Sequence, residues 1–87
     1  MALKRYMVIE TFDPANLEAI YRRLSEKGRG LPEGLFFVDS WLAANNSEVY
    51  QLMETEDQNL LHVWADYWSD LVSFKFIELR EKPTSPQ

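Results

Sequence analysis

The sequence of 87 residues contains no cysteine and only one histidine. Without thiols the chain can form neither a disulfide framework nor a thiolate metal site, and nothing ties its fold to an oxidising compartment. A single imidazole also gives little support for a zinc site, because such sites need several nitrogen or sulfur ligands. We therefore expect neither a metal nor a cofactor.

Long apolar runs and an excess of basic residues are absent as well. No stretch approaches the length of a membrane span, and the charged N-terminus has no apolar run behind it long enough for a signal peptide. Nine basic against 14 acidic residues give a net charge of -5, which disfavours binding to nucleic acid or to an anionic membrane surface. We therefore expect a cytoplasmic location. The one basic cluster, interpreted as a solvated helix end, consists of Arg22, Arg23, Lys27 and Arg29.

The sequence does contain a clear succession of periodicities. Alternating runs, typical of strands, cover residues 5–12, 35–44, 47–55 and 72–79, and a helical stripe follows the first and the third of them. This succession, β-α-β-β-α-β, predicts one α+β, ferredoxin-like domain over residues 1–80. It has a four-stranded antiparallel sheet with two helices on one face. A disordered polar tail is expected over residues 81–87.

Start and stop signals delimit both predicted helices. Asp13-Pro14 is typical of an N-cap followed by the first helical residue, and Gly28 is suited to end that helix in the left-handed conformation. The segment from Thr55 to Gln58 has the spacing of a capping box before the second helix. The apolar stripes are Leu17, Ile20, Tyr21 and Leu24 in the first helix, and Leu60, Leu61, Trp64, Ala65, Trp68 and Leu71 in the second. We interpret the two tryptophans as core or dimer contacts.

The two middle strands are expected to form a hairpin around Asn45-Asn46, since asparagine tolerates the positive φ angles of a tight turn. With a two-residue loop Trp41 lies opposite Tyr50. A loop one residue longer or shorter brings Gln51 and Met53 to that face instead. The hairpin register therefore decides which side chains share a surface.

The first strand is apolar on both faces, with Tyr6, Val8 and Phe12 on one and Met7 and Ile9 on the other. A strand of this kind is covered on both sides, but two helices cover only one face of a four-stranded sheet. A second copy of the chain is the simplest cover for the other face. We therefore expect a homodimer joined through its sheets; the alternative is a monomer with one partly exposed apolar face.

Four short blocks of the sequence resemble a family of short, uncharacterised bacterial proteins classed as a domain of unknown function. The blocks are Tyr6-Met7-Val8-Ile9-Glu10, Leu31-Pro32-Glu33-Gly34-Leu35, Val38-Asp39-Ser40-Trp41 and Gln51-Leu52-Met53-Glu54-Thr55. The resemblance covers residues 5–79 and implies the dimeric α/β-barrel form of the ferredoxin-like fold. It implies no reaction and supplies no catalytic residue, although Trp41 and Glu54 match recurrent positions.

In a dimeric barrel of this type, alternate side chains point into the space between the two sheets. The residues expected to line a ligand pocket there are Tyr6, Glu10, Asp39, Trp41, Tyr50 and Glu54. A carboxylate in such an aromatic, partly dehydrated setting has a raised pKa and is suited to general acid or base catalysis. The simpler alternative is that these carboxylates reach water at the strand ends.

Three functions remain open on this basis. The first is a homodimeric module that binds a small, partly aromatic molecule in the inter-sheet pocket. The second, by analogy with related folds, is a cofactor-free enzyme of the monooxygenase or isomerase type with one carboxylate as proton acceptor. The third is a structural or regulatory partner protein without a ligand, marked by an exposed apolar patch outside the dimer interface. The sequence does not decide whether the chain is an enzyme.

Other candidate motifs have weaker support. His62 and Asp66 lie four residues apart but off the apolar stripe, which is typical of a solvated helix pair. The segment Gly28-Arg29-Gly30 follows a helix, whereas a phosphate cradle opens one. No serine stands in a nucleophile-elbow sequence. Nucleophilic catalysis and phosphate binding are therefore not indicated.

Overall fold

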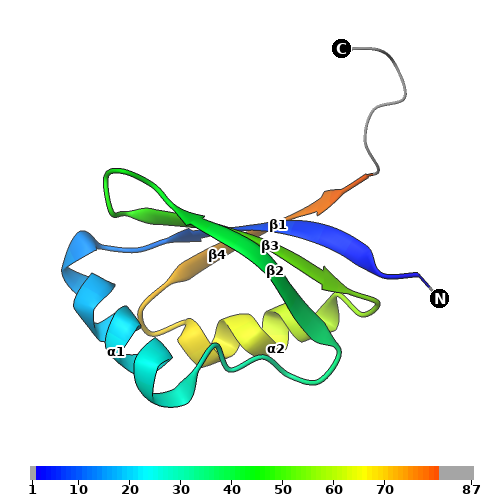
Figure 1. The fold of residues 1–87 in the computed structure, drawn as a ribbon, viewed down its shortest axis with the longest axis horizontal. Helices are drawn as coiled ribbons and strands as arrows, with labels where there is room; N and C mark the ends of the chain where they lie inside the picture. The colour runs from blue at the N-terminus through cyan, green and yellow to red at the C-terminus, as the bar shows by residue number, and fades with distance from the viewer. Residues whose placement is uncertain (1, 81–87) are drawn as a thin grey trace, which may run out of the picture.

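The computed structural model of the protein describes residues 2–80, and its elements follow the predicted order (Figure 1). The elements are β1 (Lys4–Thr11), the 3-10 turn η1 (Pro14–Asn16), α1 (Leu17–Lys27), β2 (Leu35–Leu42), β3 (Glu48–Thr55), α2 (Asn59–Trp68) and β4 (Ser73–Leu79). All strand pairings are antiparallel, in the order β2-β3-β1-β4. The predicted ferredoxin-like α+β fold is therefore confirmed. The predicted tail, residues 81–87, lies outside the described residues.

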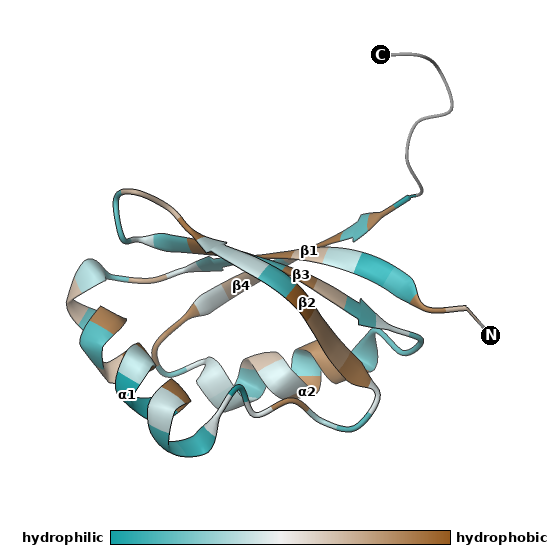
Figure 2. Ribbon diagram, viewed as in Figure 1, coloured by the Kyte–Doolittle hydropathy of each residue, from teal (hydrophilic) through white to brown (hydrophobic). Residues whose placement is uncertain are grey.

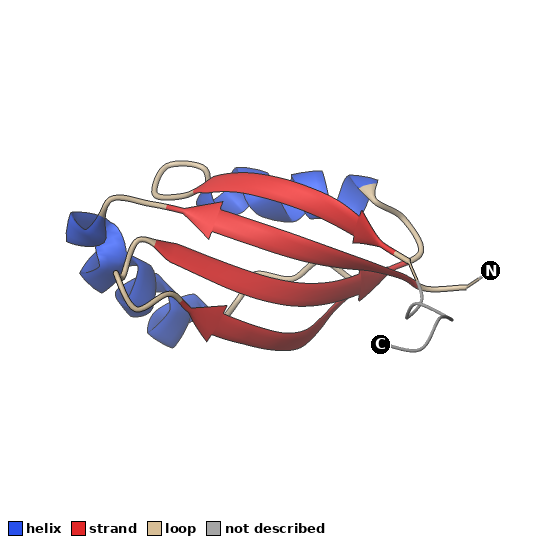
Figure 3. Ribbon diagram, turned by 90° about the horizontal axis from the view of Figure 1, so that it is seen from above, coloured by secondary structure: helices blue, strands red, loops and turns tan. Residues whose placement is uncertain are grey.

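Both helices lie on the same side of the sheet, as the side view and the view from above agree (Figure 1, Figure 3). We call this side the covered face and the other the open face. Even positions of β1 and odd positions of β3 belong to the covered face, because these alternating side chains are the buried ones. The buried apolar core consists of Tyr6, Val8, Phe12, Leu35, Met53, Leu61, Trp64, Trp68 and Val72.

The open face is apolar too. Met7 and Ile9 of β1 are partly exposed there, and Phe36 and Trp41 of β2 are each 51% exposed. The first half of β2 is strongly hydrophobic in Figure 2. The expectation that the first strand is apolar on both faces is therefore confirmed.

The first helix begins later than Asp13-Pro14 suggests. The Asp13 carboxylate accepts a hydrogen bond from the Ala15 backbone N–H at 2.9 Å, as a capping residue does, but η1 intervenes before α1 starts. Gly28 ends α1 as predicted, and its N–H donates to the Leu24 carbonyl at 2.9 Å. Its φ of 69° is positive but its ψ is -164°. The ending is therefore a glycine conformation other than the left-handed helical one.

The capping box predicted at the start of the second helix does not form. Thr55 ends β3 in a fully buried position, and its hydroxyl donates to the Gly34 carbonyl at 2.8 Å. Asp57 takes the capping role instead, because its carboxylate accepts a hydrogen bond from the Asn59 backbone N–H at 3.0 Å. Among residues 2–80, no helix combines the length and the apolarity needed to cross a membrane.

Of the two hairpin registers left open by the sequence, the structure has the one expected for a two-residue loop, but its turn is longer. Trp41 pairs with Tyr50, and the Ala43 N–H donates to the Glu48 carbonyl at 2.8 Å before the chain turns. Asn46 has a positive φ of 60°, and its N–H donates to the Ala43 carbonyl at 2.9 Å. Because the loop is longer by the same amount on both strands, residues 39–42 keep the partners that a two-residue loop predicts. Before the β-bulge between Phe37 and Asp39 the pairing is shifted by one residue.

Candidate functional site

The strand register divides the six predicted pocket residues between the two faces of the sheet. Tyr6 pairs with Met53 and Glu10 with Val49, and Tyr6 and Glu10 are buried on the covered face, with 4% and 7% exposure. The other four belong to the open face: Asp39, Trp41, Tyr50 and Glu54. The expectation that Tyr6 and Glu10 share a surface with the hairpin residues is wrong, since directly paired residues point to the same side.

The open-face group forms a mixed apolar and polar surface in a single copy of the chain. The Arg5 guanidinium donates to the Glu54 carboxylate at 2.9 Å, so Glu54 is paired with a cation of its own chain. The Asp39 carboxylate accepts a hydrogen bond from the Ser40 backbone N–H at 2.8 Å. Both carboxylates therefore already have hydrogen-bond partners within the chain.

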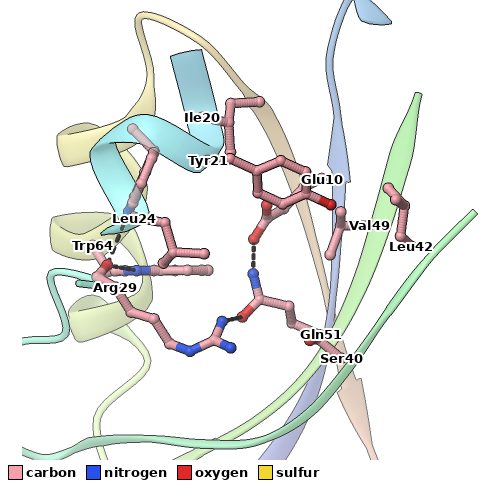
Figure 4. Close-up of a pocket in the computed structure, with 11 residues that line it drawn as sticks. Glu10, Ile20, Tyr21, Leu24, Arg29, Ser40, Leu42, Val49, Gln51 and Trp64 are labelled. Carbon is pink, nitrogen blue, oxygen red and sulfur yellow. Dashed lines mark hydrogen bonds between the residues drawn. The ribbon is translucent and has the colours of Figure 1, made fainter. Parts of the chain in front are cut away.

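A cavity of about 130 Å³ lies on the covered face, between α1, α2 and the sheet (Figure 4). Its polar groups come from Glu10, Arg29, Ser40 and Gln51, and its apolar walls from Ile20, Tyr21, Leu24, Leu42, Val49, Trp64 and Trp68. A β-bulge between Phe37 and Asp39 explains how β2 takes part. The extra residue shifts the alternation, so Ser40 follows Phe37 onto the covered face. Glu10 is the one predicted pocket residue that reaches this cavity.

Glu10 is linked through Gln51 to a positive charge. The Gln51 side-chain amide donates a hydrogen bond to Glu10 Oε2, and Arg29 Nη1 donates to Gln51 Oε1 at 3.3 Å (Figure 4). The Arg29 guanidinium also lies over the Phe37 ring, 3.6 Å from its centroid. We call these three hydrogen-bonded side chains the Glu10–Gln51–Arg29 relay. It connects a cation on the loop after α1 to a carboxyl group on β1.

The environment of Glu10 favours its protonated form. Burial raises the pKa of Glu10 from its usual 4.5 to about 7, whereas the Gln51 hydrogen bond and the Arg29 charge act to lower it. Both protonation states of Glu10 are therefore populated near neutral pH. The neutral carboxyl group can donate a hydrogen bond to a ligand, and the ionised one can accept a proton. Titratable groups of this kind beside a cavity are typical of functional sites.

The loop after α1 holds Arg29 in place through its backbone. The Arg29 carbonyl accepts hydrogen bonds from the indole N–H groups of both Trp64 and Trp68, at 2.9 Å each. Gly28 and Gly30 on either side have φ angles of 69° and 72°, which residues with a Cβ rarely adopt. The interpretation of Arg29 as part of a solvated helix end is therefore wrong. The prediction that Trp64 and Trp68 belong to the core is confirmed.

The rest of the predicted basic cluster lies outside the cavity. Arg23 donates two hydrogen bonds to the Asp70 carboxylate, at 2.9 and 2.6 Å, and thereby ties α1 to the turn after α2. Arg22 donates to Glu18 within α1 at 3.3 Å. Arg29 is thus the member of the cluster that contributes to the candidate site.

Three polar residues of the cavity were not in the predicted set. Gln51 had a recognisable signal, because it alternates in step with Met53 and Thr55, which are both buried. The signal for Arg29 was weaker: it stands between two glycines, and glycines allow the backbone conformations that can turn such a residue away from the helix end. Ser40 had an ambiguous signal. Alternation from Trp41 puts it beside Gln51, whereas alternation from Leu35 and Phe37 puts it on the other face unless the bulge is known.

A second cavity, of about 260 Å³, lies elsewhere on the covered face. Tyr6 lines this cavity, together with Gln58, Leu61, His62, Phe76 and Glu78. His62 is exposed, as predicted for a solvated helix residue, and its ring meets the edge of Phe76 with centroids 5.2 Å apart. Tyr6 and Glu10 therefore belong to separate cavities. Within residues 2–80, no group of three or more His, Cys, Asp or Glu side chains is placed to hold a metal ion.

Comparison with models of known protein families matches residues 4–78 to a domain of unknown function, DUF3303. Comparison with curated proteins gives no match. The family match includes both helices and all four strands except the last residue of β4, Leu79. The resemblance drawn from the four sequence blocks is therefore confirmed.

Proposed function

Because this chain belongs to the DUF3303 family, which has no assigned function, we propose from its own residues that it binds a small, largely apolar molecule in the cavity beside Glu10. One observation carries this proposal: a carboxyl group that is 7% exposed lies on the wall of a cavity lined mainly by apolar and aromatic side chains. Burying such a group costs free energy that an apolar residue would not cost. Natural sequences place such unfavourable groups in the interior mostly at functional sites.

The chemistry of the walls favours a compact ligand with a planar part. Aromatic rings of Tyr21, Trp64 and Trp68 border the cavity and can pack against a flat molecule. Glu10 and Ser40 offer hydrogen bonds to a hydroxyl or carbonyl group at one side. The ligand is therefore a small, partly aromatic molecule with one polar group, held on the covered face and not between two sheets.

The three tryptophans provide a direct test. Trp64 and Trp68 border the cavity, whereas Trp41 lies on the open face, so their indole N–H signals in NMR spectra report on the two faces separately. Native mass spectrometry of freshly purified protein identifies a co-purifying molecule, and a panel of small aromatic alcohols and ketones serves as added probes. Binding should shift the Trp64 and Trp68 signals and leave that of Trp41 unchanged.

Two variants check the role of Glu10. Glu10→Gln should weaken probe binding roughly tenfold, the usual effect of losing a hydrogen bond to an ionisable partner. Glu54→Gln, on the open face of the same sheet, is the matched control and should bind as the wild type does. Equal weakening by both variants, or shifts confined to Trp41, would contradict the proposal.

A second candidate function is proton transfer to or from the bound molecule, with Glu10 as general acid or base. The observation in its favour is that burial raises the pKa of Glu10 to about 7, near the value that suits a proton-transfer residue at neutral pH. A bound ketone with an acidic C–H bond should exchange that hydrogen for deuterium in heavy water. Glu10→Gln should abolish the exchange. If a ketone binds to the wild type but does not exchange its hydrogen, proton transfer is refuted and ligand binding alone is the function.

We also propose that a second copy of the chain covers the open face. Phe36 and Trp41 are each 51% exposed there, and Ile77 of β4 is 38% exposed. A twofold axis lets each copy present this same apolar surface to the other. Asp39, Trp41, Tyr50 and Glu54 then lie at the interface, which separates them from the ligand cavity.

Light scattering coupled to size exclusion tests this arrangement. Trp41→Asp should convert the dimer to a monomer, because it puts two charges into an apolar interface. Val63→Asp is the matched control, since Val63 is an apolar residue of α2 with 57% exposure and should leave the dimer intact. A wild-type protein that runs as a monomer at tens of micromolar would refute the proposal.

A further inference from the structure

Arg29 lines the cavity of about 130 Å³ without a carboxylate at ion-pair distance. Arg5, Arg22 and Arg23 each lie 2.6 to 3.3 Å from a carboxylate oxygen, whereas no ion pair in the described part of the chain includes Arg29. Arg29 is nevertheless half-buried. Partial removal of a cation from water costs free energy that a nearby anion offsets. The cavity therefore favours a ligand that brings a negative charge.

The Arg29 guanidinium has donors to spare for such a ligand. A guanidinium carries several N–H donors in one plane, and among the described residues the Arg29 side chain makes a single hydrogen bond. It runs from Nη1 to Gln51 at 3.3 Å, longer than most N–H···O hydrogen bonds (Figure 4). The Phe37 ring supports one face of the guanidinium, 3.6 Å from the ring centroid. A planar fork of N–H groups held in this way matches the two oxygens of a carboxylate.

Glu10 complements this cation when it is protonated. Gln51 stands between the two residues, because it accepts from Arg29 and donates to Glu10. Burial raises the pKa of Glu10 to about 7, so below that pH its carboxyl group is mostly neutral and can donate a hydrogen bond to a ligand oxygen. The polar end of the cavity then carries one positive charge, which favours an anion of one charge.

We propose that the ligand of this cavity is a small aromatic monocarboxylate, with its carboxylate bound to Arg29 beside Glu10 and its ring packed against Trp64 and Trp68. The inference rests on the proposed function, because it names the polar group of the molecule that the cavity binds. An apolar cavity of about 150 Å³ holds one benzene molecule, so about 130 Å³ is suited to a single ring. Aromatic walls contribute beyond the burial of apolar area.

NMR titration with benzoate, and with benzamide as its neutral counterpart of the same shape, tests the proposal. Both compounds should shift the indole N–H signals of Trp64 and Trp68. Benzoate should bind roughly tenfold more tightly at about pH 6, as expected for hydrogen bonds between charged partners. Arg29→Met should remove this preference and leave the affinity for benzamide unchanged. Arg29→Lys should keep part of the preference, because an ammonium retains the charge but not the planar fork. Arg22→Met, on the exposed side of α1, is the matched control and should bind both compounds as the wild type does.

The same titration at about pH 8 tests the part played by Glu10. Ionised Glu10 repels an anion, so the affinity for benzoate should fall as the pH rises through about 7, and that for benzamide should change less. Among the described residues, the other ionisable groups that line the cavity are Tyr21 of α1 and Arg29. The linings from β2, β3 and α2 contain none, and the β4 partner of Glu10 is Phe74. Glu10→Gln should therefore remove the pH dependence of benzoate binding.

The outcomes separate this inference from the proposed function. If benzamide or benzyl alcohol shifts Trp64 and Trp68 and benzoate binds no better, the carboxylate assignment is overturned while the cavity stays a ligand site. A preference for benzoate that persists in Arg29→Met would also overturn it. If none of the three compounds shifts these signals, or if only Trp41 responds, the proposed function fails as well. Equal affinity for benzoate at both pH values would refute the contact with Glu10.

Discussion

The covered and open faces of the sheet use similar side chains in opposite ways. On the covered face, Trp64 and Trp68 are almost fully buried and both donate their indole N–H groups to the Arg29 carbonyl. On the open face, Trp41 is half exposed. The carboxylates differ likewise, since Glu10 is buried and Glu54 is paired with Arg5 near solvent. One face is organised within the chain, and the other is left available for contact with something else.

The comparison separates two kinds of apolar surface. Apolar groups around Glu10 enclose a cavity and surround a group that is costly to bury, which favours binding or chemistry. Apolar groups around Trp41 enclose nothing within one chain, which favours association. The predicted inter-sheet pocket combined Glu10 with Trp41, whereas the strand register places these two residues on different faces of the sheet.

The largest expected difference between the faces concerns stability. Trp64→Ala should lower the free energy of unfolding by about 3 to 5 kcal/mol, because it empties a packed core position and removes a hydrogen bond to Arg29. Trp41→Ala should cost less than about 1 kcal/mol in the monomer, as exposed substitutions do. Urea unfolding at two protein concentrations measures both.

The dependence of stability on protein concentration further distinguishes Trp41→Ala from Trp64→Ala. If a second copy covers the open face, the cost of Trp41→Ala grows with protein concentration, because association stabilises the wild type by mass action. The cost of Trp64→Ala should change little. Equal costs for the two variants at low concentration would remove the distinction between the faces.

The second prediction concerns pH. The folded protein holds the Glu10 proton more tightly than the unfolded chain, because the folded pKa is about 7 and the usual value 4.5. The contribution of Glu10 to stability is therefore complete below pH 4.5 and is lost as the pH rises through about 7. This difference in pKa corresponds to about 3 kcal/mol.

Measuring the unfolding free energies of wild type and Glu10→Gln isolates the contribution of Glu10 to stability. The measurements run between pH 4 and 8, a window set by these two pKa values. The gap between the two proteins should change by up to about 3 kcal/mol across the window, with Glu10→Gln the flatter curve. Glu54→Gln, on the open face, should follow the wild type. Parallel curves for wild type and Glu10→Gln would show that Glu10 is not held in its protonated form.

The third prediction concerns the loop that brings Arg29 to the covered face. A Cβ added at Gly30 would lie 2.7 Å from two ring carbons of Tyr67, and the φ of 72° is unfavourable for alanine. Gly30→Ala should cost about 1 to 2 kcal/mol. Gly28→Ala is the matched control, because its φ is similarly positive at 69° but no atom lies within 4 Å of the added Cβ. It should cost less, by thermal or urea unfolding, and a larger cost for Gly28→Ala would contradict this account.

The sequence predicts the fold better than the site, and particular residues explain why. Alternation and helical stripes reflect burial, which the packing of Val8, Met53 and Trp64 enforces, so the element order was predictable. The hairpin register stayed open between two alternatives, because it depends on the length of the turn. Gly28 was predictable as a helix end for the same local reason. These features depend on short segments of the chain.

The cavity depends on contacts between distant segments. Arg29 reaches Gln51 because its carbonyl is fixed by two indoles of α2, and Ser40 shares a face with Phe37 only because β2 contains a bulge. Neither a tertiary hydrogen bond nor a single-residue bulge changes the periodicity enough to be read from one sequence. Glu10 was predicted as a site residue but placed with the wrong neighbours, since its face was not known.

The smallest expected effect concerns the influence of the Arg29 charge on the pKa of Glu10. Arg29→Met keeps a long side chain over Phe37 and keeps the backbone carbonyl that both tryptophans bind, but it removes the positive charge. Because that charge acts to lower the pKa of Glu10, the variant should raise that pKa above about 7. Carbon-13 NMR titration of the glutamate carboxyl groups measures it.

Arg22→Met removes an equal charge from the exposed side of α1 and should leave the Glu10 titration unchanged, since exposed charges are strongly screened by water and salt. An unchanged pKa in Arg29→Met would mean that Arg29 positions Gln51 without tuning the proton affinity of the site.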